Sequence, residues 1–183
     1  MGQRLNIEIF AENRILANAY YHWSGYTRSA YRLCCNIIAE YKGAEPTVEE
    51  AVRLLETTGA GFDEYEIENA ITVLPAELCK EATDRNRGLI AITKSAIEET
   101  RGAEEARVTI YLDAERVDFD VWNQFEEEDL EDYGLVLGHT DLPIHWLRFE
   151  DMGALDDLID YATNGTQSIA VKTKRGEIIC PIE

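Results

Sequence analysis

Four aromatic side chains and a histidine that could bind a ligand or take part in catalysis lie around a Ser24-Gly25 turn. They are Tyr20, Tyr21, His22, Trp23 and Tyr26. In a strand, alternate side chains face opposite ways, so Tyr21 and Trp23 would share one face and Tyr20 and His22 the other. We therefore expect one pair to pack in the core under a following helix and the other to lie at the rim of the sheet. The alternative is a site for a small polar ligand, such as a nucleotide-derived signal, formed by Tyr20, His22, Tyr26 and the nearby Arg28 or Arg32.

A nucleophilic mechanism needs a Ser, Cys or Thr beside a base. The candidate nucleophiles are Ser24, Thr27, Cys34 and Cys35, and the candidate bases are His22, His139 and His145. No GxSxG turn or other signature brings these residues together, and the chain has no phosphate-binding GxxxxGK[ST] or GxGxxG loop. The histidines and cysteines also lack the spacing of a zinc site. A hydrolase is therefore a further alternative, while the prediction is a protein without catalytic residues, metal or cofactor.

An acidic run interleaved with aromatic residues is the stronger candidate for a functional surface. The twenty residues from Asp113 to Asp132 include ten acidic residues and one basic residue, Arg116, which gives a local charge of −9. Such a run is often a solvated loop, but solvating segments are poor in aromatic residues. Carboxylates held on a rigid strand and helix can instead pair with cations that normally hold phosphates. The predicted partner-binding residues are Asp118, Asp120, Trp122, Phe125, Glu126, Glu127, Glu128, Asp129, Glu131, Asp132 and Tyr133.

The charge of the whole chain favours the same interpretation. Its 183 residues include 17 basic and 36 acidic ones, a formal net charge of −19, which repels nucleic acid and anionic membranes and favours basic partners. Charged residues near the N-terminus argue against a signal peptide, and no apolar run is long enough for a membrane span, so a cytoplasmic protein is expected. A second acidic face comprises Glu45, Glu49, Glu50, Glu56, Asp63, Glu64, Glu66 and Glu68, against Arg53 alone.

The hydrophobic pattern predicts a single α+β domain over residues 1–183, with an antiparallel sheet built from three hairpins and helices on one or both faces. Alternation of apolar and polar residues predicts the hairpins at 3–23, 107–122 and 168–182. A short buried strand is expected at 88–92. Helical spacing predicts helices at 27–42, from Val48 to near Gly59, at 93–105 and at 149–162, with two short pieces in 62–86 separated at Pro75.

The N-terminal sequences MGQRLNIEI and LANAYYHWSGYT, followed by an amphipathic helix, resemble the start of small proteins encoded by bacteriophages and mobile elements of Gram-positive bacteria. The resemblance covers less than a quarter of the chain and centres on an HW-x-GY core of His22, Trp23, Gly25 and Tyr26. It implies a bacterial host cell, in which compact acidic phage proteins include anti-CRISPR and anti-restriction inhibitors, some similar to duplex DNA in charge layout. We therefore expect a non-enzymatic, DNA-mimicking inhibitor whose partner is the basic surface of a CRISPR effector or restriction nuclease.

Overall fold

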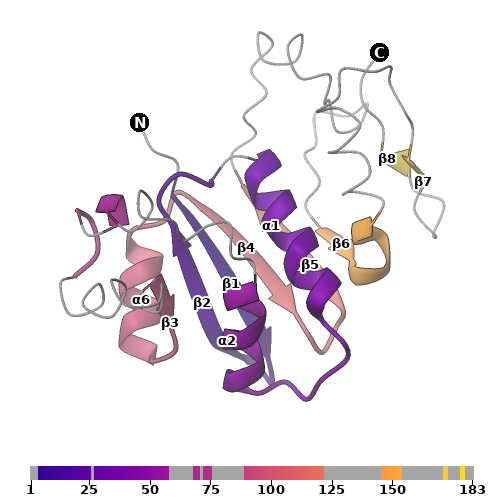
Figure 1. Cartoon of the computed structure of the whole chain (residues 1–183), viewed down its shortest axis with the longest axis horizontal. Helices are drawn as coiled ribbons and strands as arrows, with labels where there is room; N and C mark the ends of the chain where they lie inside the picture. Colours follow the sequence, from indigo (N-terminus) through magenta and orange to yellow (C-terminus); the bar gives the residue numbers. More distant parts are fainter. Residues whose placement is uncertain are drawn as a thin grey trace, which may run out of the picture.

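A six-stranded sheet forms the centre of the fold (Figure 1). The computed structural model describes residues 4–25, 27–57, 68–70, 72–75, 89–121, 146–153, 171–172 and 178–179. The strands are β1 (Leu5–Ala11), β2 (Arg14–Tyr21), β3 (Ile90–Ala91), β4 (Ala106–Tyr111), β5 (Arg116–Asp120), β6 (Trp146–Arg148), β7 (Val171–Lys172) and β8 (Ile178–Ile179). The helices are α1 (Thr27–Glu40), α2 (Val48–Thr57), α6 (Lys94–Gly102) and a 3₁₀ turn at Phe149–Asp151.

The strand order in the sheet is β3-β2-β1-β4-β5-β6. All neighbouring strands are antiparallel except β1 and β4, which pair in parallel. The α+β fold with a mostly antiparallel sheet is thus confirmed, and the first two predicted hairpins are β1–β2 and β4–β5. Strands β7 and β8 pair with each other in a separate two-stranded ladder, so the third hairpin does not extend the six-stranded sheet.

One face of the sheet is apolar and packs against α1 and α2. Leu5, Ile7 and Ile9 of β1 point to this face and are fully buried. On α1, the ring of Tyr31 meets that of Phe119 of β5 edge-on, with centroids 4.7 Å apart. The predicted cap of α2 is also present, since the hydroxyl of Thr47 accepts a hydrogen bond from the backbone N–H of Glu50 at 3.2 Å. These contacts form the main hydrophobic core.

Helix α6 lies over the opposite face, beside β2 and β3 (Figure 1). The helix begins after Thr93, whose side chain accepts a hydrogen bond from the backbone N–H of Ala96. Helix α6 falls within the predicted helix at 93–105, and β3 within the predicted strand at 88–92. Most of the expected pieces in 62–86, and the predicted helix at 149–162 beyond Gly153, lie outside the described residues. In the part of the chain that the structure describes, no helix has both the length and the apolarity that a bilayer crossing requires.

Candidate functional site

The turns of the β1–β2 and β4–β5 hairpins and the loop from α1 to α2 lie at the same end of the sheet (Figure 1). The backbone N–H of Glu12, in the first turn, donates to Asp113 Oδ2, in the second turn, at 2.7 Å. The loop from α1 to α2 reaches the same end, where the rings of Tyr41 and Phe149 are in contact. We call this surface the acidic end; it comprises Glu12, Glu40, Glu45, Glu49, Glu50, Asp113 and Glu115.

Three carboxylates of the acidic end act on the same side chain, Tyr41. The pKa of its phenol is raised, first by burial and then by the negative charges of Glu115, Glu50 and Asp113. These three acids come from α2 and from the β4–β5 turn, so their proximity is a product of the tertiary fold. The acidic end therefore concentrates negative potential on a fixed framework of helix and turns.

Only part of this charge is neutralised by neighbouring cations. Arg53 pairs with Glu50 at 2.6 Å, and the hydrogen bond from Arg53 lowers the pKa of Glu50. Arg14 lies 3.9 Å from Glu12. Among the described residues, the other five carboxylates of the acidic end form no ion pair with Lys or Arg; they are Glu40, Glu45, Glu49, Asp113 and Glu115.

The predicted acidic run is divided between two surfaces. Asp113 and Glu115 lie in the β4–β5 turn at the acidic end, whereas Asp118 and Asp120 follow on β5, on the side of the sheet opposite α1 and α2. Asp118 is paired there with Arg116 Nε at 2.7 Å, so its charge is locally compensated. The rest of the predicted partner-binding set lies outside the described residues, as do His139 and His145; that set is Trp122, Phe125, Glu126, Glu127, Glu128, Asp129, Glu131, Asp132 and Tyr133.

The aromatic cluster differs from the prediction in the position of Tyr20. Tyr21 is buried on the helix-covered face, where one of the two pairs was expected, but Tyr20 and His22 are also buried, at 0% and 8% exposure, and do not form an exposed rim. The Tyr20 hydroxyl lies 3.0 Å from His22 Nδ1, and Trp23 meets the His22 ring edge-on. Burial, followed by the positive charge of Arg4, lowers the pKa of His22. Since Tyr20 has no exposed surface, its side chain cannot line an open ligand-binding site.

The structure describes only part of the remaining residues of the alternative ligand site. Tyr26 lies outside the described residues, and for Arg28 the structure describes the backbone of α1 but not the side chain.

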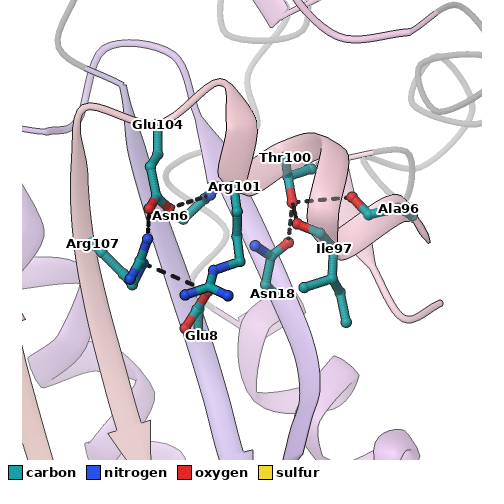
Figure 2. Close-up of polar contacts among 9 residues, drawn as sticks. All are labelled: Asn6, Glu8, Asn18, Ala96, Ile97, Thr100, Arg101, Glu104 and Arg107. Atoms are coloured by element: carbon teal, nitrogen blue, oxygen red, sulfur yellow. Dashed lines mark hydrogen bonds and ion pairs between the residues drawn. The ribbon is translucent and has the colours of Figure 1, made fainter. Parts of the chain in front are cut away.

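A polar network that sequence reasoning missed lies between α6 and the sheet (Figure 2). Glu8 of β1 has a side chain only 4% exposed, and its Oε1 lies 2.8 Å from Arg101 Nε and 3.7 Å from Arg107 Nε. Arg107 also forms an ion pair with Glu104, which accepts a 2.7 Å hydrogen bond from Asn6 Nδ2. We call this set the α6 network; it comprises Asn6, Glu8, Asn18, Thr100, Arg101, Glu104 and Arg107.

The buried ion pairs of the α6 network are suited to fixing α6 on the sheet. Burial raises the pKa of Glu8, and the charges of Arg101 and Arg107 partly oppose that increase. A carboxyl with a raised pKa is typical of acid–base catalysis, but a catalytic acid must reach its substrate. The carboxylate of Glu8 is enclosed by two arginines under a helix, so it holds α6 in place. The sequence does place Asn6, Glu8 and Asn18 at polar positions of the hairpin strands. Such positions can face either solvent or a covering helix, and the alternation pattern is the same in both cases.

The chain matches no protein-family model, no curated protein sequence and no solved structure.

Proposed function

We propose that this protein is a non-enzymatic inhibitor that uses an acidic surface to occupy the basic nucleic-acid channel of a host enzyme, such as a CRISPR effector or a restriction nuclease, in the bacterial cytoplasm. The observation that carries the proposal is the acidic end, where Glu50, Asp113 and Glu115 come together around Tyr41. The net charge of −19 supports it, because such a chain repels nucleic acid and is attracted to the cations that bind nucleic acid.

A rigid acidic surface suits this role better than a charged tail. A flexible tail loses conformational entropy when its charges are ordered by a partner, which weakens the interaction. At the acidic end the hydrogen bond between Glu12 N–H and Asp113 joins the two turns before any partner arrives. Preorganised carboxylates of this kind can accept hydrogen bonds from Lys and Arg much as phosphate oxygens do. Complementary charge of this type acts chiefly on association rate and specificity.

The test compares two variants that lose the same amount of negative charge. The first, E49Q/D113N/E115Q, neutralises the acidic end; the D113N substitution keeps a side-chain oxygen that can accept from Glu12 N–H. The control, E68Q/E98Q/E99Q, neutralises three exposed acids elsewhere. Each protein is titrated against CRISPR effectors and restriction nucleases loaded with fluorescent duplex DNA, and displacement of the DNA is measured by anisotropy.

We expect the native protein to displace DNA from at least one such enzyme and the control to retain this activity. The acidic-end variant should need about tenfold more protein, as three surface pairs of roughly 0.5 kcal/mol each would imply. Its binding should also weaken less with added salt. If both variants lose the same amount of DNA-displacing activity, the effect comes from net charge alone. If neither variant loses activity, the acidic end is not part of the interface. Nucleotides that bind the free protein with measurable heat would favour the ligand-binding alternative.

A further inference from the structure

The part of the second sheet face that lies beyond α6 presents polar and aromatic side chains. On β5 and β6, Val117 and Leu147 are buried on the helix-covered side, so their neighbours Arg116, Asp118, Trp146 and Arg148 point to the other side. Trp146 is 43% exposed, one of two large hydrophobic side chains of the described chain that reach solvent to this extent. We call this surface the open face; it comprises Tyr111, Arg116, Asp118, Asp120, Trp146 and Arg148.

Two charges of the open face are left over after local pairing. Arg116 is satisfied within the face, because its guanidinium pairs with Asp118 and lies 4.8 Å from the centroid of the Tyr111 ring. Arg148 and Asp120 are exposed, and neither forms an ion pair within the described part of the chain. Arg148 lies opposite Arg116, a charge of the same sign. Asp120 lies opposite Arg107, whose guanidinium already pairs with Glu104 and lies 3.7 Å from Glu8.

The two unpaired charges are placed symmetrically about Trp146. Trp146 lies opposite Asp118 in the β5–β6 register. Arg148 is two residues from Trp146 in one direction, and Asp120 is two residues from Asp118 in the opposite direction. At a rise of about 3.3 Å per residue they are roughly 13 Å apart along the strands, too far for an ion pair with each other. The face thus carries a cation on one side of its exposed tryptophan and an anion on the other.

We propose that the open face binds a second copy of this chain around a two-fold axis that crosses the strands at Asp118 and Trp146. Such an axis places Arg148 of the first copy against Asp120 of the second. By symmetry, Asp120 of the first copy lies against Arg148 of the second, on the opposite side of the axis. The two Trp146 side chains meet at the axis, where aromatic residues are favoured in interfaces. Two ion pairs flanking an aromatic contact give a self-complementary interface.

Charge argues for a second copy over other occupants. An anionic ligand would meet Asp118, Asp120 and the large negative charge of the chain, whereas a cationic ligand would meet Arg116 and Arg148. A partner that places an anion against Arg148 and a cation against Asp120 satisfies both unpaired charges, and a second copy related by the two-fold axis does so. An axis across the strands also reverses strand direction between the copies, so the two acidic ends point away from each other. Repulsion between these strongly negative regions is thereby reduced, since surface charges are screened within about 8 Å at physiological salt.

The test is a charge-swap experiment read by sedimentation velocity over a range of protein concentrations at physiological salt. We expect concentration-dependent dimers for the native chain, and dissociation constants raised about tenfold by either R148E or D120R, because each substitution changes two symmetry-related contacts. The double variant D120R/R148E restores opposite charges across the axis and should return to within about threefold of the native value. W146S should weaken the dimer without affecting far-UV circular dichroism.

Two comparisons separate this interface from a general charge effect. K94E changes the net charge as much as R148E does, but on the exposed start of α6, and should leave the dissociation constant unchanged. D120R makes the chain less negative, so simple repulsion would predict a tighter dimer where the proposal predicts a weaker one. A native chain that stays monomeric at all concentrations, single variants that dimerise normally, or a double variant that folds but does not recover would each overturn the proposal. None of these results bears on the acidic end.

Discussion

Replacing Arg101 with Met should destabilise the protein more than neutralising its partner Glu8. The R101M substitution keeps an unbranched side chain of similar reach along the sheet, so the change is mainly electrostatic. It leaves the Glu8 carboxylate, which is 4% exposed, with Arg107 at 3.7 Å as its remaining ion-pair partner. E8Q instead removes the buried charge, and the arginine that it leaves, with 38% of its side chain exposed, can turn toward water.

The size of the effect follows from burial. Removing one partner of a fully buried ion pair costs about 3–5 kcal/mol, because a charge is left without compensation. Arg101 is partly exposed and Arg107 remains, so solvent screening reduces the expected cost of R101M to about 2 kcal/mol. For a chain of this size that corresponds to a fall in Tm of roughly 4–8 °C. E8Q should cost about 1 kcal/mol or less, because an amide is easier to bury than a carboxylate.

The cost of R101M should also depend on pH. Burial raises the pKa of Glu8 in the folded protein above its ordinary value of 4.5, so the folded state holds this proton more tightly than the unfolded chain does. The contribution of Glu8 to the free energy of unfolding is therefore greatest below pH 4.5 and declines as the pH rises through the folded-state pKa. Loss of Arg101 raises that pKa further. The cost of R101M should then grow as the pH rises above 4.5 and be complete once Glu8 is ionised.

Urea unfolding followed by far-UV circular dichroism at 25 °C measures these differences. A series from pH 5 to 8 keeps the protein above its pI of about 4.4. R53M is the matched control, since Arg53 lies at the surface, where solvent screens its ion pair with Glu50, and its loss should change stability much less than R101M does. The reasoning is refuted if E8Q is as destabilising as R101M at every pH, or if R101M behaves like R53M.

Three further predictions concern α6 and the strand beside it. T100V removes the hydroxyl that donates to Asn18 Oδ1 at 2.9 Å, leaving a buried amide without this partner, and should cost about 1–3 kcal/mol in urea unfolding, whereas T100S should restore most of it. T93A removes the side-chain cap of α6 at the backbone N–H of Ala96 and should lower stability by about 1 kcal/mol, as calorimetry would show. His22 should titrate below its ordinary pKa of 6.5 in NMR spectra; because the unfolded chain binds the proton more tightly, stability should fall as the pH drops from 6.5 through the folded-state pKa, and H22Q should flatten this slope.

Local elements of this fold were predictable because their signals are local. Alternating apolar residues mark β1 and β2, and the two-residue turn between them uses Glu12 and Asn13, both with positive φ. The capping residue Thr47 likewise marks the start of α2. The parallel pairing of β1 with β4 carries no such signal, because it joins segments about a hundred residues apart through backbone bonds that any sequence can form.

The candidate surfaces were predictable in kind but not in position. The sequence shows that acidic residues are abundant, yet strand alternation on β5 directs Asp118 toward Arg116, while the turn directs Asp113 toward Glu12. Tertiary contacts of this kind decide which carboxylates are neutralised. Exposure of a polar strand residue also depends on what covers the sheet, and α6 covers Glu8 although the residue alternates like a solvent-facing one.

The α6 network and the acidic end depend on the same strand register. In the parallel pairing of β1 and β4, Glu8 lies opposite Thr109 and Phe10 opposite Tyr111. A slip of one residue along β1 would turn Glu8 into the apolar layer under α1 and α2, without an arginine to compensate its charge. We therefore expect the network to exclude neighbouring registers, whatever it adds to net stability. The same register brings Glu12 to Asp113 four residues further along, so the register that the α6 network favours is also the one in which the two turns of the acidic end are joined.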